Sequence, residues 1–438
     1  MASSQEDATR RLAYLSGAAR VSTRPEAGAV GPRAHVLGVI DAFRRLGWEV
    51  RPYIVGDSVP LSWVAGEATD RAMRSSPMKR VAADMIRLAI GAVHGPRSLR
   101  HVGQVDWVYE RYAAFQALGW WFQRKGSPWI LETNELCYLS ATTDRKATAL
   151  GPVLRYQERW AYRQCDVLVC NSQALADVIV ERMAITTEKI VVLPNGVDTA
   201  RMDPGKARPT RAFPGPTLGF VGQLEAWQRL DVLLDVLAEL HQDGIDYHLA
   251  VVGDGSMREQ WEAYAKSLGL GDRVRFVGRR PWDEVPDHIA GFDLGYLGYA
   301  STAPVRRVHT GSASTEVDDG PPEHETAAWL RSHLSPLKLY EYAAMGKPVI
   351  AAAYADAKRL LADGVPCYLF DPGNRQDLKR ALRHAYQERD RWAEAGVRGR
   401  AVVVAKHSWE ARVRELVACV ETILKGKYGA FEAAGRRG

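Results

Sequence analysis

A lysine and a glutamate three residues apart have the spacing to hold a phosphate and a sugar. Lys338 and Glu341 lie in the stretch SPLKLYEYAAMGKPVIAA, residues 335–352. Ser335 is a favoured N-cap, a proline follows it and Gly346 suits a left-handed end, so the stretch predicts a helix of about ten residues and then a strand. Lys338 falls in the first turn, where the free N–H groups already make the helix end positive.

A bound phosphate would explain this placement of a cation. It would accept hydrogen bonds from the N–H groups of Leu337 and Lys338, and it would neutralise a lysine that the helix end disfavours by roughly 0.3–1 kcal/mol. Glu341, one turn deeper on the same face, would accept hydrogen bonds from two neighbouring ribose hydroxyls. The structural alternative is that Lys338 extends into solvent and Glu341 is a surface residue.

Length and composition are typical of a soluble globular protein with more than one domain. The chain has 438 residues, of which 46% are hydrophobic and 25% charged, and no apolar run is long enough to span a bilayer. The N-terminus does not resemble a signal peptide, and the five cysteines show neither CxxC pairing nor metal-ligand spacing, which favours a reducing cytoplasm. The net charge of +6 is spread out without a nucleic-acid-binding motif, so no nucleic-acid partner is predicted. The oligomeric state is left open.

Short apolar segments alternate with amphipathic ones, which predicts an α/β fold with parallel sheets. The proline-rich stretch 193–216 separates two similar halves. The predicted domains cover 1–200 and 201–407, and a helix with tail follows over 408–438. Residues 303–334 are polar and rich in turn formers, which predicts a long loop or lid.

The predicted strands are Arg11–Leu15, Val50–Val55, Trp107–Tyr109, Trp129–Glu132, Val167–Cys170, Ile190–Leu193, Thr217–Val221, His248–Val252, Arg273–Val277, Asp293–Leu297 and Val349–Ala351. Helices are predicted over about 34–46 and from 408 to about 427, because apolar residues recur there at helical spacing.

Several segments, in order along the chain, resemble the large retaining glycosyltransferase family four, whose fold is GT-B. The segments are VYERYAAF (108–115), WILETNEL (129–136), KIVVLPNGVD (189–198), LGFVGQLEAWQRLDVLLDVL (218–237) and VVGDGSMREQWEAYAKSLGLGDRVRFVGRRPWDEVPDHIAGFDLGYL (251–297). SPLKLYEYAAMGKPVIAA resembles the donor segment of the branch with an SPLK-x-x-E-Y motif. The resemblance implies two Rossmann-like domains facing across a cleft, with the C-terminal helix returning toward the N-terminal domain. It also implies transfer of a sugar from a UDP- or GDP-sugar bound mainly by the C-terminal half.

The resemblance implies roles for particular residues. Glu341 corresponds to the ribose-binding glutamate, and Lys338, with Leu337 and Ser335, to the phosphate-contacting turn. The other donor-site positions that it implies are Gly222, Gln223, Gly253, Gly255, Gly278, Arg279 and, in the loop 25–35, Gly31.

Three positions depart from the family pattern. Gln223 stands where the family often has an arginine, and Gln228 where it usually has a lysine. His333 stands where the family has the earlier of two glutamates. The charge on a leaving diphosphate would then come from Lys338 together with Arg229, or with Arg279 and Arg280.

The resemblance implies glycosyl transfer with retention at the anomeric carbon. Helix N–H groups, Lys338 and Arg229 would stabilise the departing diphosphate, and His333 is a third candidate catalytic residue. The leaving oxygen would take the proton of the acceptor, so the protein supplies mainly geometry. The sequence contains no Asp-x-Asp pair and no His/Cys cluster, so no metal and no other cofactor is expected.

The acceptor side is less specific. His35, Glu132 and Asn134 are candidate substrate-binding residues, and Glu110 and Arg111 are similar candidates, with capping or a buried hydrogen bond as the alternative for each. The acceptor is expected to be a small molecule, a natural product or a saccharide. Residues 71–101 are basic with a short apolar stretch, which leaves open a peripheral enzyme that acts at a membrane on a lipid-linked polysaccharide precursor.

Two further functions remain as alternatives. A catalytically silent nucleotide-sugar-binding homologue would account for the neutral Gln223 and Gln228. A dinucleotide oxidoreductase is suggested only by VVGDGSMR, residues 251–258, in which Arg258 replaces the third glycine of the usual motif.

Overall fold

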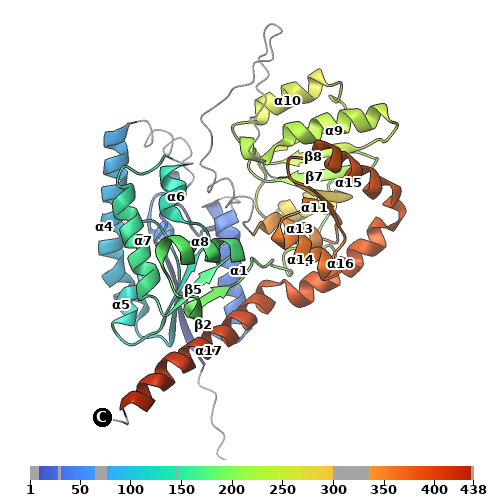
Figure 1. The fold of residues 1–438 in the computed structure, drawn as a ribbon. Helices are drawn as coiled ribbons and strands as arrows, with labels where there is room; N and C mark the ends of the chain where they lie inside the picture. Colours follow the sequence, from blue (N-terminus) through green and yellow to red (C-terminus); the bar gives the residue numbers. More distant parts are fainter. Residues whose placement is uncertain (1–8, 28–30, 65–75, 144–145, 299–334, 436–438) are drawn as a thin grey trace, which may run out of the picture. The chain divides into compact units, whose positions relative to one another are not determined.

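The computed structural model describes residues 9–27, 31–64, 76–143, 146–298 and 335–435. The chain divides into two compact units. Unit 1 comprises Met1–Asn195 and Trp409–Gly438, and unit 2 comprises Gly196–Ser408. Each unit has its own six-stranded parallel sheet with helices packed on it (Figure 1). The boundaries predicted from the sequence, 200 and 407, lie close to these two junctions.

The sheet of unit 1 has the strand order β2-β1-β3-β4-β5-β6. Its strands are β1 (Arg11–Ser16), β2 (Glu49–Ile54), β3 (Trp107–Arg111), β4 (Trp129–Thr133), β5 (Val167–Cys170) and β6 (Ile190–Val192). Its helices are α1 (Gly31–Arg45), α2 (Leu61–Val64), α4 (Pro77–Val102), α5 (Gly119–Gln123), α6 (Cys137–Thr142), α7 (Gly151–Gln164), α8 (Gln173–Met183) and α17 (Trp409–Gly435). The central strands β4 and β5 are buried at every position, because helices cover both faces of a parallel sheet.

The C-terminal helix α17 packs on α1, as the resemblance implied. The Trp409 ring meets the His35 ring edge-on, with the ring centroids 4.8 Å apart. Trp409 also occupies the space above Gly38, where an added Cβ would lie 2.1 Å from Trp409 Nε1. An ion pair between Arg45 and Glu410 extends this contact by one turn. The last helix of the chain is therefore part of unit 1.

The sheet of unit 2 has the strand order β12-β11-β10-β7-β8-β9. Its strands are β7 (Thr217–Val221), β8 (His248–Val252), β9 (Val274–Gly278), β10 (Leu294–Leu297), β11 (Val349–Ala352) and β12 (Cys367–Phe370). Its helices are α9 (Leu230–Gln242), α10 (Arg258–Ser267), α11 (Val285–Ala290), α13 (Leu337–Ala344), α14 (Ala355–Ala362), α15 (Arg375–Gln387) and α16 (Trp392–Lys406).

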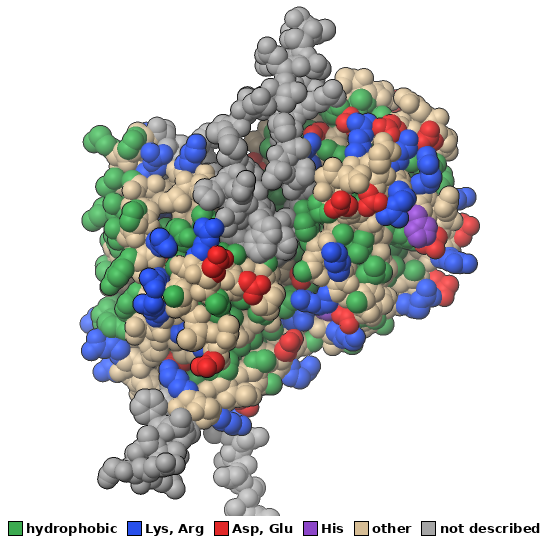
Figure 2. Space-filling model, in the orientation of Figure 1, with side chains coloured by type: hydrophobic (Ala, Val, Ile, Leu, Met, Phe, Trp, Pro, Cys, Tyr) green, Lys and Arg blue, Asp and Glu red, His purple; other side chains and the backbone are tan. Residues whose placement is uncertain are grey.

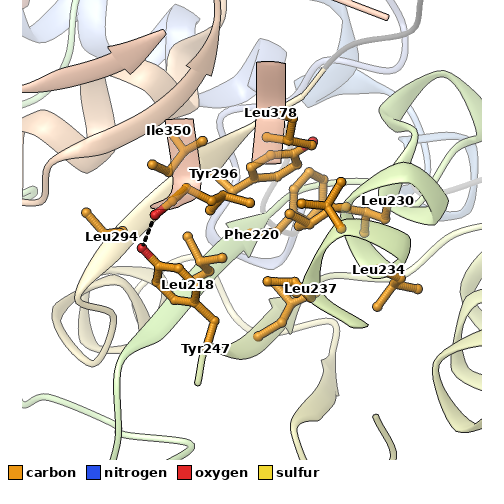
Figure 3. Close-up of a cluster of buried hydrophobic side chains, with 14 of the residues drawn as sticks. Leu218, Phe220, Leu230, Leu234, Leu237, Tyr247, Leu294, Tyr296, Ile350 and Leu378 are labelled. Atoms are coloured by element: carbon orange, nitrogen blue, oxygen red, sulfur yellow. Dashed lines mark hydrogen bonds between the residues drawn. The ribbon is translucent and has the colours of Figure 1, made fainter. Parts of the chain in front are cut away.

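Alternate strand residues of unit 2 enter two separate cores. On one face α9, α10 and α15 pack against the sheet, with Phe220, Tyr296 and Ile350 among the buried strand residues (Figure 3). On the other face α11, α13, α14 and α16 pack against residues that include Val252 and Ala351. The strand order runs in opposite directions from the neighbouring strands β7 and β10, with β8 and β9 beyond β7 and β11 and β12 beyond β10. In sheets of this kind, ligands bind at the carboxyl ends of the strands where the order reverses.

The sequence predicted most elements but missed one strand. The observed strands agree with the predicted ones to within two residues, whereas β12 was not predicted. β12 has only four residues between two turns, too few to show a period. Helix α1 begins at Gly31 rather than Ala34, and Gly31 is therefore the first residue of a helix and not part of a loop. The predicted lid, residues 303–334, lies outside the described residues.

Within the described segments, no helix has both the length and the apolar character needed to cross a bilayer.

We expect Gly38→Ala to destabilise the protein, although alanine is normally the better helix former by about 1 kcal/mol. The added methyl group would collide with the Trp409 indole, and overpacking of this kind typically costs about 1–3 kcal/mol. The measurement is the midpoint of urea unfolding. Gly426→Ala is the matched control, because that glycine also lies in a helix but an added Cβ meets nothing within 4 Å. A rise in the midpoint for Gly38→Ala would contradict the packing described above.

Candidate active site

Helix α13 begins one residue later than its sequence suggests. Its N-cap is Pro336, without a side-chain cap. Ser335 was predicted to cap the helix, and this is wrong: its buried hydroxyl donates instead to the carboxylate of Asp356. A buried carboxylate needs a donor, so it takes the serine that the helix end would otherwise use. Leu337 and Lys338 are thus the first two residues of the helix.

Tyr342 fixes α13 to the sheet. Its hydroxyl accepts a hydrogen bond of 2.8 Å from the backbone N–H of Val221, at the carboxyl end of β7. Its ring fills the space beside Gly295 on β10, where an added Cβ would lie 2.3 Å from the ring. Helix α13 is therefore held against the neighbouring strands β7 and β10.

The Lys338 ammonium is folded inward and not extended into solvent. Lys338 Nζ lies 4.1 Å from the centroid of the Phe220 ring and 3.4 Å from Gln228 Oε1, to which it donates. An added Cβ on Gly222 would lie 2.9 Å from it. Burial lowers the pKa of the Lys338 ammonium to about 7, although Glu341 acts in the opposite direction. No carboxylate of the described residues lies within ion-pairing distance, so this cation lacks a counter-charge.

Glu341 lies on the same face of α13 as Lys338. Arg201 Nη2 is 3.9 Å from Glu341 Oε1, and the Arg201 guanidinium stacks on the Trp282 ring at 3.7 Å. Burial raises the pKa of the Glu341 carboxyl, against the opposing effects of Arg201 and Lys338. Asp198 shapes the turn that leads to Arg201, because its Oδ1 accepts from the backbone N–H of Arg201 at 3.2 Å.

The predicted donor-site glycines bring loops of unit 2 into backbone contact. Gly222, Gly253 and Gly278 have φ values of +149°, +140° and +84°. An added Cβ on Gly253 would lie 1.9 Å from the Gly222 carbonyl oxygen, and one on Gly255 would lie 2.6 Å from Leu224 N. These residues are needed for the packing of the loops after β7 and β8, whatever else they contact.

The remaining donor-side candidates differ in their surroundings. Arg229 has φ +48°, and its Nε pairs with Asp231 Oδ1 at 3.0 Å. Gln223 and Arg279 are exposed. His333 lies outside the described residues.

In unit 1 the structure brings the three predicted substrate-binding residues together. His35 Nε2 lies 2.7 Å from Glu132 Oε1, and Asn134 Nδ2 donates to the same oxygen at 3.1 Å. His35 is on α1, whereas Glu132 is on β4, and both are buried. Burial by itself would raise the pKa of Glu132, but His35, Arg111 and Tyr109 together lower it. Glu132 is therefore held as a carboxylate.

Several buried polar atoms near this carboxylate have no hydrogen-bond partner among the described residues. They are Tyr14 Oη, Ser16 Oγ, His35 Nδ1 and Arg111 Nε. Ser16 and Arg111 are register partners on β1 and β3, and Arg111 and Glu132 are register partners on β3 and β4, so these groups form a row at the carboxyl ends of three adjacent strands. Buried polar groups without partners are rare, and a row of them is the pattern that a bound polar ligand would complete.

Glu110 has a structural role, as its alternative interpretation predicted. Its two carboxylate oxygens accept from the N–H groups of Leu118 and Gly119 at 2.8 Å each, at the start of α5. Burial raises the pKa of Glu110 to about 7, and these two hydrogen bonds limit the rise.

Sequence reasoning missed Phe220, Gln228, Arg201 and Trp282 as neighbours of Lys338 and Glu341. From the sequence, Gln228 is notable only because it stands where the family usually has a lysine. Its side chain is in fact buried and accepts from Lys338, so a lysine at this position would bring two ammonium groups together. Within the described part of the chain, no group of three His, Cys, Asp or Glu side chains is arranged to hold a metal ion.

The fold defines the class of this protein. The structure of this chain is similar to that of sucrose-phosphate synthase from Thermosynechococcus elongatus. The TM-score is 0.64 and the identity 16%, and the match covers 95% of this chain and 100% of that one. It is also similar to Anabaena HepE in complex with UDP and glucose, with a TM-score of 0.56, 15% identity and coverage of 94% and 100%. The chain has the GT-B fold of two Rossmann-like domains.

Family comparisons identify both halves more closely. Residues 31–201 match the model described as Glycosyltransferase Family 4, and residues 208–297 match the model described as Glycosyl transferases group 1. The chain thus combines a family 4 glycosyltransferase segment with a group 1 glycosyltransferase segment.

Two curated relatives illustrate the range of similarity. The chain is 31% identical over 151 residues to 2-deoxystreptamine glucosyltransferase of Streptomyces kanamyceticus, which covers 33% of this chain and 39% of that protein. It is 24% identical over 436 aligned positions to D-inositol 3-phosphate glycosyltransferase of Geodermatophilus obscurus, which covers 93% of this chain and 88% of that protein. The match to the first relative spans well under two thirds of its length.

We expect Lys338→Met to stabilise the protein in the absence of ligand. The folded pKa of about 7 lies below the ordinary 10.5, so the folded state binds fewer protons than the unfolded state between these values. The cost of burying the charge is therefore fully present below pH 7 and disappears as the pH rises toward 10.5. Removing the charge should raise the unfolding free energy by roughly 1–3 kcal/mol at pH 6. Thermal unfolding across this pH range measures the effect.

Lys347→Met is the matched control for this measurement. Burial also lowers the pKa of Lys347, but its ammonium donates to the Ala290 carbonyl oxygen at 2.8 Å, so its removal should destabilise the protein. A lower melting temperature for Lys338→Met at pH 6 would mean that the Lys338 charge is already balanced within the protein.

Proposed function

We propose that this protein is a glycosyltransferase that moves a sugar from a nucleotide-diphosphate donor to a small polyhydroxylated acceptor. The observation that carries the proposal is the half-buried Lys338 ammonium at a positive helix end, which has no carboxylate partner among the described residues. A charge placed in this way destabilises the empty protein and is retained where a ligand completes it. The two glycosyltransferase family matches support the same activity.

The donor pyrophosphate would bind at the N-terminus of α13. The N–H groups of Leu337 and Lys338 and the Lys338 ammonium would stabilise the charge that develops on the leaving diphosphate. Glu341 would accept from the ribose hydroxyls, with Arg201 3.9 Å away holding its carboxylate in place. Arg229 is less suited to this role than the sequence indicated, because its guanidinium is paired with Asp231.

The acceptor would bind along the row of polar groups at the strand ends of unit 1. Tyr14, Ser16 and Arg111 present buried donors and acceptors, and the His35–Glu132 pair offers a carboxylate fixed in its ionised form. The names of the two relatives denote acceptors with several hydroxyl or amino groups on a six-membered carbon ring. We therefore infer that the acceptor is a cyclitol or a sugar of similar size.

Further features belong to this proposal. Transfer would proceed with retention, as the family resemblance implies: the acceptor oxygen bonds to the anomeric carbon, the bond to the diphosphate breaks, and a diphosphate oxygen takes the acceptor proton. The chain's own cations would serve the reaction without a metal. We also propose that the protein is located in the cytoplasm and that it belongs to the SPLK branch.

We expect a nucleoside diphosphate to raise the melting temperature, and Glu341→Ala to remove the rise. A screen with UDP, GDP, ADP and TDP should identify one base that stabilises by about 2.7 kcal/mol at a concentration a hundredfold above Kd. Glu341→Ala should weaken that binding at least about tenfold, because two charge-assisted hydrogen bonds are lost. The ligand-free melting temperature should stay unchanged.

Glu394→Ala is the control, because this glutamate is exposed on α16 of the same unit. An equal ligand shift in wild type and Glu341→Ala would show that the nucleotide binds elsewhere.

We expect sugar transfer to a cyclitol and its loss in Glu132→Gln. Wild-type protein incubated with the preferred nucleotide sugar and a panel of inositol, inositol 3-phosphate and 2-deoxystreptamine should release the diphosphate and form a glycoside detectable by mass spectrometry. Glu132→Gln should lower kcat/KM by about 100-fold, because a positioned charge that acts on the reacting groups is removed. Nucleotide-induced stabilisation should be retained.

Glu110→Gln is the matched control, since it changes a buried carboxylate on the neighbouring strand that only caps α5. Nucleotide binding without glycoside formation across a broad acceptor panel would instead favour a catalytically silent homologue.

A further inference from the structure

Helix α4 exposes several of its large apolar side chains to solvent. Five of them are exposed by 40% or more, and they form what we call the α4 stripe: Met78, Val81, Met85, Ile86 and Val93. Four of the five buried residues of the same helix are small or polar, namely Ala83, Asp84, Gly95 and Ser98, and the fifth is Val102 at its C-terminal end. A helix at a protein surface normally has the reverse arrangement. Figure 2 shows hydrophobic side chains gathered at the left margin of the view, where Figure 1 places α4.

Specific contacts hold the α4 stripe outward. Asp84 Oδ2 accepts from Thr148 Oγ1 and from Ala149 N at 2.8 Å each, and its Oδ1 pairs with Arg87 at 2.7 Å. About two turns before the C-terminal end of α4, an added Cβ on Gly95 would lie 2.2 Å from the Trp121 indole nitrogen. Rotation of α4 to bury the stripe would break the Asp84 hydrogen bonds and drive bulkier residues into the indole. The exposure of the stripe is thus built into the fold.

Positive charge borders the stripe. Lys79, Arg97 and Arg100 are exposed, whereas the only acidic residue of α4, Asp84, is fully buried. Lys79 and Arg97 are about five helical turns apart and therefore lie on the same flank of the helix. The surface combines an apolar strip with cations and presents no exposed carboxylate of its own.

We propose that the α4 stripe docks unit 1 onto an anionic lipid surface. The apolar side chains would enter the boundary between headgroups and acyl chains, and Lys79, Arg97 and Arg100 would lie among the anionic headgroups. From Met78 to Val93 the stripe is about 23 Å long at 1.5 Å per residue, so its whole length can lie in the plane of a bilayer. The positive charge favours an anionic lipid surface over a second copy of this chain, because two copies would bring two sets of like charges together. The docking does not depend on the proposed sugar transfer or on a lipid acceptor.

The test is sedimentation of the full-length protein with sucrose-loaded vesicles. We expect it to pellet with vesicles of phosphatidylcholine mixed with phosphatidylglycerol, to stay largely in the supernatant with phosphatidylcholine alone, and to be released by added salt. Arg97→Glu should lower the partition coefficient at least about fivefold, the factor expected for one interfacial cation. Met85→Glu should lower it further, because it places a charge within the stripe.

Val397→Glu is the matched control, since Val397 is 71% exposed on α16 of unit 2 and should not affect binding. Circular dichroism of each variant confirms that it is folded. Wild-type protein that stays in solution with both vesicles, or equal binding by wild type and Met85→Glu, would overturn the proposal. A vesicle-independent dimer that Met85→Glu dissociates would also overturn it, and would identify a second copy of the chain as the occupant.

Discussion

The candidate site of unit 2 is organised around one cation, Lys338, that has no carboxylate within ion-pairing distance among the described residues. Lys338 places an ammonium group at the positive end of α13, against the Phe220 ring and beside Gly222. Both the helix end and the burial disfavour that charge, and the depressed pKa records the cost. The neutral Gln228 keeps a second cation away from it. The nearby carboxylate, Glu341, lies 3.9 Å from Arg201, and in the proposed function a bound diphosphate would supply the counter-charge of Lys338.

The surrounding architecture serves to fix this helix end. Tyr342 ties α13 to β7 and fills the space that Gly295 leaves on β10. Gly253 and Gly255, after β8, allow their loop to touch the loop after β7 at the backbone, which a side chain at either position would prevent. Lys338 thus departs from normal local preferences, and the residues around it are tightly packed. Proteins often keep local strain of this kind at functional sites.

In unit 1 a buried ion pair is likewise combined with close packing. The junction of the two units, between Ser408 and Trp409, has an aromatic contact on each side. The His35–Glu132 pair is buried, and the His35 ring rests on Trp409, the first residue of α17. Two residues earlier, within unit 2, the His407 ring lies 5.7 Å from the ring of Tyr340 on α13. The junction between Ser408 and Trp409 is therefore flanked by one aromatic contact in each unit.

The sequence by itself determined the α/β class, nearly every strand, both Rossmann-like domains and the pairing of Lys338 with Glu341 on one helical face. These features depend on local periodicity and on short-range signals such as Gly346, whose φ is +69°. Only the tertiary structure decided that Ser335 bonds Asp356 and not the helix end, that Gln228 touches Lys338, and that His35 meets Glu132. Each of these contacts joins residues far apart in the chain, and each depends on which polar group is buried and needs a partner. The outward orientation of the α4 stripe was set in the same way, because Asp84 and Gly95 fit the interior and the larger apolar residues do not.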